Sequence, residues 1–220
     1  NPFFTVGQQM TDAIRCHLPH DKSAAITAAT EALQSVHLPD AELALNKYPH
    51  QMSGGQIQRV MIAMALACQP KVLIADEPTT ALDVTVQAQI ISLLRELAAS
   101  QDRTILFITH DLGVVASLCD NVAVMYAGEI VETGTVAEIF ASPQHPYTRK
   151  LMSTVPRLGG GQSNLDFIPG QVPDMGFLPA GCAFHPRCER ADDGCSVSAP
   201  DFMEMTAGHK VACHKTGASA

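Results

Sequence analysis

The sequence predicts an α/β fold in which a helical block comes first, a parallel sheet forms the middle and a cysteine-rich extension ends the chain. Three observations lead to this class. Apolar residues recur at helical spacing through residues 1–69, short apolar runs alternate with amphipathic segments in residues 70–133, and four of the seven cysteines lie among residues 181–220. We therefore expect three parts, 1–69, 70–133 and 134–220.

In the first part, helices are expected over residues 11–15, 22–36 and 56–68, because alanine, leucine, isoleucine and methionine recur there with a helical period. Prolines, which break helices, separate these segments at Pro19, Pro39 and Pro49.

The middle part changes period at Lys71. Residues 72–75 and 104–108 are short apolar runs, which we expect to be strands buried on both faces. Residues 84–100 and 112–119 carry helical patterns after each run. This strand–helix–strand–helix order is typical of a parallel sheet.

The remaining chain is less regular. Residues 122–126 and 129–132 flank Ala127-Gly128 and predict a hairpin, and a helical stretch follows from residue 134 to about residue 151. Glycines 159–161 are typical of a linker. Beyond them the pattern is too polar and aperiodic for the tail to build much core from apolar side chains alone.

Composition excludes several function classes. A formal net charge of −8 and a pI near 5.5 argue against a sequence-independent grip on nucleic acid. The longest apolar run, residues 60–68, is far shorter than the roughly 20 residues that cross a bilayer. No cationic, apolar leader opens the chain, and the clustered cysteines indicate a cytoplasmic protein with a local thiolate site. Because Asn1 is not an initiator residue, we expect further sequence before it.

The strongest motif is Met52-Ser53-Gly54-Gly55-Gln56, which directly precedes a predicted helix. A serine and two glycines at this place let backbone amides approach an anion, with the positive end of the helix dipole behind them. The alternative is an ordinary glycine-rich helix cap.

Two carboxylates follow the first predicted strand, where ligands bind in open parallel sheets. Asp76 is placed to hold Mg²⁺ through its water shell, and Glu77 is placed to polarise an attacking water. His110 ends the next strand, so it reaches the same sheet edge and could bond a γ-phosphate oxygen. The alternatives are two surface acids in a turn and a histidine that caps a strand.

These motifs, in this order, resemble the ATP-binding-cassette (ABC) ATPase family. Met52–Gln56 is similar to its signature motif, residues 72–77 to its Walker B strand with the catalytic glutamate, Ala81-Leu82-Asp83 to its D-loop and His110 to its switch histidine. The resemblance covers roughly residues 1–133. It implies a partial P-loop NTPase fold, with a helical signature subdomain over 1–69 and the second half of a RecA-like core over 70–133.

The resemblance also implies that two cassettes enclose two ATP molecules with Mg²⁺, each site using the signature loop of the opposite subunit. Glu77 and His110 would then be catalytic, and Asp76 would hold the metal. The residues expected to bind the nucleotide and its metal are Ser53, Gly54, Gly55, Gln56, Asp76 and Asp83.

One element of the family is missing. No G-x-x-x-x-G-K-[ST] phosphate loop occurs in the sequence, and the glycines near residue 160 have no lysine with them. In the family this loop lies upstream of the signature, so we expect it before Asn1. Gln8 and Gln9 are poor candidates for the family's Q-loop glutamine, which lies before Asn-Pro. We expect the chain by itself to be inactive as an ATPase.

Four further segments resemble the oligopeptide/dipeptide importer cassettes, although nickel importers share much of the tail. They are Asn1-Pro2, Tyr48-Pro49-His50-Gln51, Gln144-His145-Pro146-Tyr147-Thr148 and residues 181–188, and Thr5-Val6-Gly7 is a fifth such segment. The resemblance implies an ATPase subunit that energises import of di- or oligopeptides at the cytoplasmic face of the inner membrane. Its partners would be a second cassette, identical or different, two transmembrane permease subunits and, indirectly, a solute-binding protein.

The last four cysteines have the spacing C-x5-C-x6-C-x17-C, at Cys182, Cys188, Cys195 and Cys213. Burial of free thiols in an apolar core conflicts with the polar residues around them, and disulfides suit secreted chains. Zinc sites usually contain a C-x2–4-C pair, which is absent here, whereas irregular spacing also suits an iron–sulfur cluster. The resemblance favours a four-iron four-sulfur (4Fe-4S) cluster, with zinc as the alternative. His185, His209 and His214 are possible substitutes or neighbours.

Three other functions compete with peptide import. DNA-repair and chromosome-organising ATPases also use a signature loop, but the sequence has none of the heptad runs that their coiled coils require. An ABC ATPase for nickel or another small solute keeps the chemistry and changes the cargo. The third is an inert metal-binding or regulatory fragment of such a cassette.

Overall fold

The computed structural model describes residues 1–80, 82–100, 103–154 and 167–216, and it divides into two units, Asn1–His110 and Asp111–Ala220. Ala81 of the expected D-loop and the expected glycine linker at residues 159–161 lie outside the described residues. Within the described part of the chain, no helix has the length and apolar character needed to cross a membrane.

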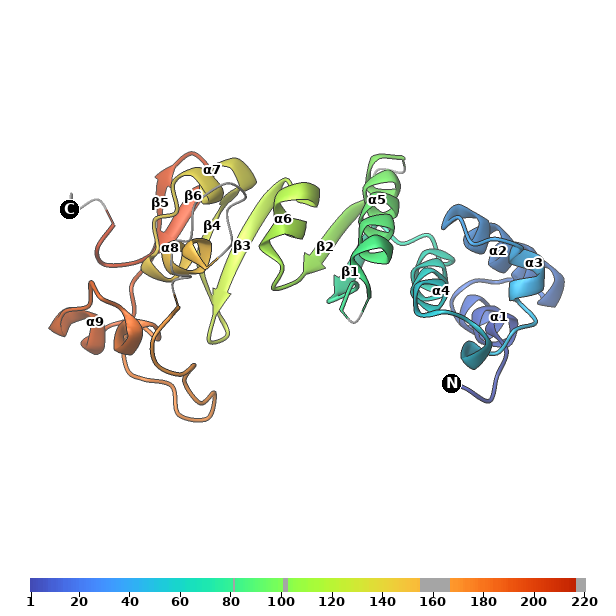
Figure 1. Cartoon of the computed structure of the whole chain (residues 1–220), viewed down its shortest axis with the longest axis horizontal. Coiled ribbons are helices and arrows are strands. Elements are labelled where there is room, and N and C mark those ends of the chain that lie inside the picture. The colour runs from blue at the N-terminus through green and yellow to red at the C-terminus, as the bar shows by residue number, and fades with distance from the viewer. Residues whose placement is uncertain (81, 101–102, 155–166, 217–220) are drawn as a thin grey trace. The chain divides into compact units, whose positions relative to one another are not determined.

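The first unit opens with the helical block that the sequence predicts (Figure 1). Thr5 begins the first helix with a capping box to Gln8, and Asp21 caps the second, which explains why these helices start where they do. Met10 and Ile14 on the first helix and Leu33 on the second are fully buried. The elements are α1 (Val6–His17), α2 (Lys22–Ser35), α3 (Ala41–Ala44), the 3₁₀ turn η1 (Pro49–Gln51) and α4 (Gly54–Leu66).

The parallel sheet is confirmed, as two strands with a helix between them in sequence. β1 (Val72–Asp76) pairs in parallel with β2 (Thr104–Ile108), and α5 (Val84–Ser100) connects them. α5 buries Ile90 and Leu94 completely, and each such side chain stabilises the fold by about 1.5–3 kcal/mol.

The prediction that both strands are buried on two faces is wrong. Burial alternates along β1, where Leu73 and Ala75 are buried but Ile74 is 64% exposed, and Leu106 of β2 is also exposed. The described residues of this unit cover one face of the sheet only. The continuous apolar run therefore does not distinguish a two-faced strand from a one-faced strand here.

The second unit is built on an antiparallel sheet in the order β3-β4-β6-β5 (Figure 1). The predicted hairpin is confirmed, since Ala127 and Gly128 both have positive φ, as a two-residue turn between twisted strands requires. The elements are α6 (Leu112–Leu118), β3 (Asn121–Tyr126), β4 (Glu129–Thr135), α7 (Val136–Ala141), α8 (Pro146–Ser153), the 3₁₀ turn η2 (His185–Arg187), α9 (Asp193–Val197), β5 (Phe202–Thr206) and β6 (His209–Ala212).

The single helical stretch expected after residue 134 is instead two helices, α7 and α8. Ser142 precedes Pro143 and leaves the helical region with φ −146°, because the proline ring disfavours helical backbone in the residue before it. Pro146 then occupies the first turn of α8, where its missing N–H costs nothing.

The tail, which we expect to build little core from its own apolar side chains, packs against the preceding sheet. Phe184 is 1% exposed and packs edge-on against Tyr126, while β6 pairs with β4 and buries Val211. The sequence shows no periodicity for this because Phe184 lies in a loop and β6 contributes only every second residue. The tail thus completes the core of β3, β4 and α7.

Candidate functional site

Glu77 and His110 meet at the ends of the two parallel strands, as the sequence predicts. The backbone N–H of Glu77 donates to the carbonyl of Ile108 at 2.9 Å, which closes the strand ends together. A side-chain hydrogen bond of 2.8 Å joins His110 Nδ1 to Glu77 Oε1, and Thr80 Oγ1 donates to Glu77 Oε2 at 2.5 Å. Thr80 was not singled out from the sequence.

The carboxylate of Glu77 is held in one position and in one ionisation state. Hydrogen bonding from Thr80, and then from His110, lowers its pKa, so Glu77 is ionised at neutral pH. Its backbone has φ +47°, an uncommon conformation for a residue with a side chain, of the kind that clusters at functional sites. Asp76, one residue earlier, ends β1 with an exposed carboxylate. This arrangement can orient a water and present a second carboxylate to a hydrated cation.

The glycine-rich motif forms the amino-terminal end of α4. Ser53 Oγ accepts from Gln56 N at 3.3 Å and Gln56 Oε1 accepts from Ser53 N at 3.0 Å, so these side chains form a capping box. The helix-cap alternative therefore describes part of what the motif does. Its two glycines differ in their surroundings, because a Cβ at Gly55 would lie 2.7 Å from Val86 whereas one at Gly54 would meet nothing closer than 3.8 Å.

Asp83 lies at the start of α5 and caps it. Its Oδ1 accepts from Val86 N at 2.9 Å and its carbonyl accepts from Gln87 N at 2.8 Å. The nearest neighbour of Gly54 is Leu82, so the glycine motif and the segment around Asp83 lie next to each other.

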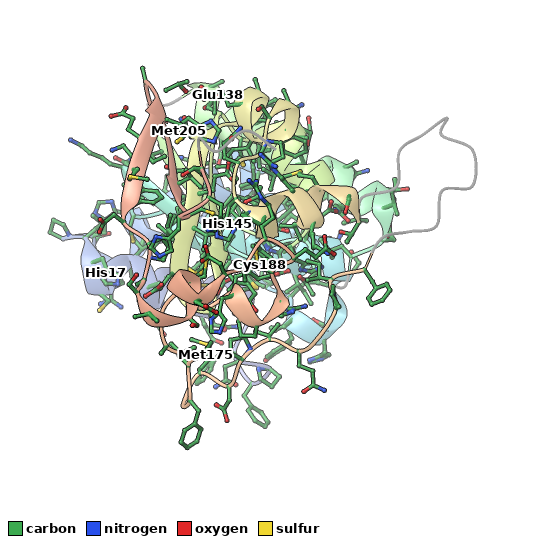
Figure 2. All side chains as sticks on the ribbon, turned by 90° about the vertical axis from the view of Figure 1, so that its left-hand side faces the viewer. His17, Glu138, His145, Met175, Cys188 and Met205 are labelled. Atoms are coloured by element: carbon green, nitrogen blue, oxygen red, sulfur yellow. The ribbon has the colours of Figure 1, made fainter. Side chains whose placement is uncertain are left out.

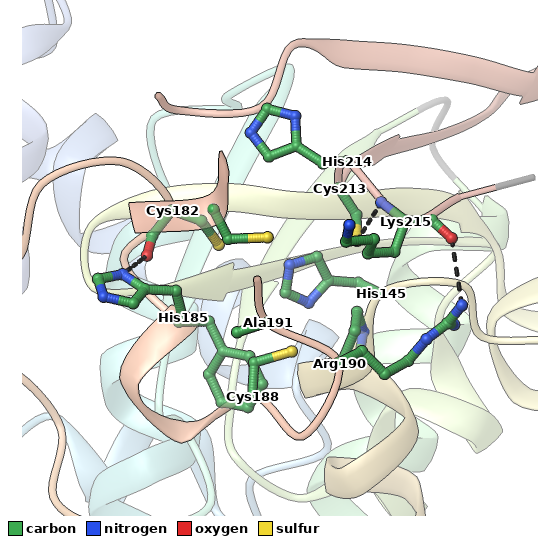
Figure 3. A pocket seen from close by; sticks show the side chains of 12 residues that line it. His145, Cys182, His185, Cys188, Arg190, Ala191, Cys213, His214 and Lys215 are labelled. Carbon is green, nitrogen blue, oxygen red and sulfur yellow. Dashed lines mark hydrogen bonds between the residues drawn. The ribbon is translucent and has the colours of Figure 1, made fainter. Parts of the chain in front are cut away.

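The four terminal cysteines line one cavity of the second unit, of about 20 Å³ (Figure 3). Cys182 and Cys188 flank η2, Cys195 lies in α9 and Cys213 follows β6. Gly181 has φ +71° and lies so close to the Cys195 carbonyl that a Cβ would approach it to 2.4 Å, which brings the two loops together. All four are free cysteines.

The conflict expected between these cysteines and apolar burial does not hold. Cys195 and Cys213 are buried, and Cys182 and Cys188 pack against the Phe184 core, because the folded tail shields them. Burial raises the pKa of the Cys182, Cys188 and Cys213 thiols, and neighbouring thiols raise it further. In each of these three the sulfur also accepts a backbone N–H from the residue two places on, which opposes that rise.

The histidines around the cavity are only in part those singled out from the sequence. His185 and His214 line it, but His209 instead binds Glu132 Oε1 at 2.8 Å. His145, which Figure 2 labels close to Cys188, also lines the cavity (Figure 3) and was not singled out from the sequence, although the motif that contains it was. Burial lowers the pKa of His145 to about 4. In the described ranges, no group of three or more His, Cys, Asp or Glu side chains is arranged to hold a single metal ion.

Two known protein families match this chain, one in each of its two units. Residues 1–80 match the family described as ABC transporter, and residues 131–195 match the family described as oligopeptide/dipeptide transporter, C-terminal region.

Among curated proteins, the oligopeptide transport ATP-binding protein OppD of Haemophilus influenzae is 49% identical over 97% of this chain and 66% of its own length. The OppD protein of Escherichia coli is 49% identical (98% and 64%), and the oligopeptide transport ATP-binding protein AppD of Bacillus subtilis is 47% identical (97% and 65%). The chain thus spans slightly less than two thirds of the length of these relatives.

Solved structures place the fold in the same group. A metal-chelate type ABC transporter in an inward-facing conformation matches with a TM-score of 0.57 and 30% identity, over 63% of this chain and 55% of its own. The dimeric structure of the bacterial ABC transporter cassette MJ0796 matches with a TM-score of 0.54 and 30% identity, over 62% and 58%.

Proposed function

This chain belongs to the family of ABC transporter ATP-binding proteins, and from that premise we propose that it forms part of the ATP-hydrolysing subunit of an oligopeptide or dipeptide importer. The observation that carries the proposal is the contact between Glu77 and His110 at the ends of parallel strands, with Asp76 beside it. In this role Glu77 orients the attacking water, Asp76 holds Mg²⁺ through its water shell and His110 bonds the transferred phosphoryl group. Mg²⁺ held there would neutralise charge on the phosphates.

The lowered pKa of Glu77 bears on how it acts. A carboxylate that is stabilised by two hydrogen bonds is a weak base, so its contribution is to position and polarise the water more than to remove its proton early. Since His110 would also bond the phosphoryl group, its hydrogen bond to Glu77 holds the carboxylate next to the position of the phosphate.

We assign the glycine motif to the ATP held by a partner cassette. Ser53 and Gly54 are exposed at the start of a 13-residue helix, where backbone N–H groups and the helix dipole favour an anion. The open space at Gly54 is not needed for packing inside this unit, which supports a role in close approach from outside. The adjoining Asp83 segment would face the same partner.

The whole subunit needs more than this chain contains. The sequence has no phosphate-binding G-x-x-x-x-G-K-[ST] loop, so we do not expect this chain by itself to bind or hydrolyse ATP. We propose that it works at the cytoplasmic face of the inner membrane with a second cassette, two permease subunits and, indirectly, a solute-binding protein.

The function is tested with the native transporter, purified through a tag on this subunit and placed in lipid vesicles with its solute-binding protein. We expect ATP hydrolysis to rise when di- or oligopeptides are added and radiolabelled peptide to accumulate inside. If a nickel chelate stimulated ATP hydrolysis and peptides did not, the proposed substrate would be wrong. An assembly that hydrolyses no ATP would favour the inert regulatory alternative.

We further propose that Cys182, Cys188, Cys195 and Cys213 hold a 4Fe-4S cluster. The four thiols line one cavity, and their spacing lacks the C-x2–4-C pair that is usual in zinc sites. The backbone N–H groups directed at three of the sulfurs stabilise thiolates. When bound, the cluster supplies a one-electron redox centre and folding energy for the tail.

The cluster is tested by the Cys188→Ser substitution. Anaerobically purified native protein should be brown and contain iron and acid-labile sulfide in near-equal amounts, and the variant should lose nearly all of both. Cys119→Ser is the matched control, because Cys119 is a half-buried cysteine of the same unit outside the cavity, and it should keep its iron. Colourless native protein with stoichiometric zinc would support the zinc alternative, and metal-free protein would overturn both.

A further inference from the structure

We propose that His145 is a positioning residue for the iron–sulfur centre, and that its Nε2–H donates a hydrogen bond to sulfur in the cysteine cavity. This inference rests on the proposed cluster. Figure 3 shows the His145 imidazole among the side chains of Cys182, Cys188 and Cys213, and all four line the same cavity. His145 is 1% exposed, so its ring is held almost entirely inside the fold and borders this cavity.

The hydrogen bond at the other ring nitrogen fixes which nitrogen carries the proton. The backbone N–H of Tyr147 donates to His145 Nδ1 at 3.0 Å, so Nδ1 is an acceptor and carries no hydrogen. The neutral imidazole then has its proton on Nε2. Among the described residues, Nε2 has no hydrogen-bond partner, and the cavity is the space that this side of the ring borders.

The other two histidines of the cavity have the opposite arrangement. His185 Nδ1 bonds the Cys182 carbonyl at 2.9 Å, and His214 Nε2 bonds the Ser198 carbonyl at 2.9 Å. Because a carbonyl oxygen only accepts, those nitrogens carry the protons, and the remaining nitrogen of each neutral ring is an acceptor. His145 is therefore the cavity histidine whose neutral ring can donate to sulfur.

A buried carboxylate fixes the backbone of His145. Glu132 is fully buried, and its two oxygens accept the backbone N–H groups of Gln144 at 2.6 Å and His145 at 2.9 Å. His209, the first residue of β6, binds the same carboxylate at 2.8 Å, and Cys213 directly follows this strand. The ring of His145 also packs against Phe184, with centroids 5.9 Å apart. The donor is thus preorganised by strand β4 and helix α8.

A hydrogen bond to sulfur favours the reduced centre, because reduction adds negative charge that the donor stabilises. The experiment is a redox titration of the native protein, followed by electron paramagnetic resonance as dithionite supplies electrons. We expect His145→Leu to lower the ratio of reduced to oxidised cluster at a fixed potential about tenfold, which equals a shift of about −59 mV for a one-electron couple. His145→Gln, whose amide can donate, should recover part of the shift.

His214→Leu is the matched control, since it removes a cavity imidazole that cannot donate to sulfur, and its potential should equal that of the native protein. Iron and sulfide content is measured for every variant. A His145→Leu protein that keeps its iron and shows the native potential would overturn this inference and leave the cluster proposal intact. Native protein without iron would overturn both.

A second measurement needs no variant. Native protein with ¹⁵N-labelled histidine is reduced and studied by pulsed electron paramagnetic resonance, in H₂O and in D₂O. We expect a histidine ¹⁵N nucleus coupled to the cluster, and exchangeable protons near the cluster that include the one on this nitrogen. A cluster with no coupled histidine nitrogen would contradict the hydrogen bond even if the His145→Leu variant does not fold.

Discussion

Replacement of Glu77 by glutamine lowers ATP turnover by the native transporter by about 10²–10⁴-fold and leaves ATP binding intact. The amide keeps the size of the side chain but removes the charge that polarises the water. It also changes the pair with His110, whose bond to Oε1 is 2.8 Å, and the bond from Thr80 to Oε2. Since binding no longer leads to hydrolysis, the closed dimer should accumulate with ATP.

Glu96→Gln is a close control for this change. Glu96 lies in the same unit, accepts hydrogen bonds from His37 and Ser92, and has its pKa lowered by them in the same way, but it lies on α5 away from the strand ends. ATP turnover by the Glu96→Gln transporter should lie within about twofold of the native value, a difference of less than 1 kcal/mol in activation free energy. Turnover by Glu77→Gln at the level of Glu96→Gln would exclude Glu77 from the catalytic site.

Gly54→Asp should abolish the ATP-driven association of two cassettes. A carboxylate at the start of α4 would face the triphosphate held by the partner, and the two negative charges repel each other in a closing interface. The change should not unfold the protein, because a Cβ at Gly54 meets only Leu82, at 3.8 Å. Light scattering by the native subunit and its Gly54→Asp variant, each with ATP, measures the association. The Glu77→Gln background is preferable, because it otherwise accumulates dimers.

Two further variants separate charge from bulk at this position. Gly54→Asn has nearly the shape of aspartate without its charge and should keep part of the association, and Gly54→Ala should keep more. Gly55→Ala is unsuitable as a control, since its Cβ would lie 2.7 Å from Val86 and disturb the packing of α4 on α5. Dimers of Gly54→Asp that form at the native ATP concentration would show that this loop does not approach the phosphates.

The sequence by itself determined the elements whose causes are local. The apolar periods of α5 and β2 gave their bounds correctly, and Ala127-Gly128 marked the hairpin because its turn requires positive φ. Glu77 and His110 were placed together because the ends of parallel strands share one sheet edge. The glycine motif marked the start of α4, whereas α1 begins at Val6, well before the range predicted for it.

The tertiary structure alone decided which surfaces are covered. An apolar run does not record how many faces of its strand are packed, so the exposure of Ile74 and Leu106 appeared only in the folded unit. The burial of the tail also appeared only there, since it comes from β6 pairing with a strand about 75 residues earlier and from Phe184 in a loop.

The cavity lined by the four terminal cysteines shows most clearly what the sequence determines and what only the folded structure decides. The spacing of the four cysteines identified them as a set, but spacing does not reveal that the loops of Cys182 and Cys195 meet through the positive φ of Gly181. Nor does it reveal His145, which precedes α8 and reaches the cavity because a buried glutamate on β4 fixes its backbone. Residue types and local periods are properties of short segments, whereas burial, proton position and neighbours depend on segments that only folding brings together.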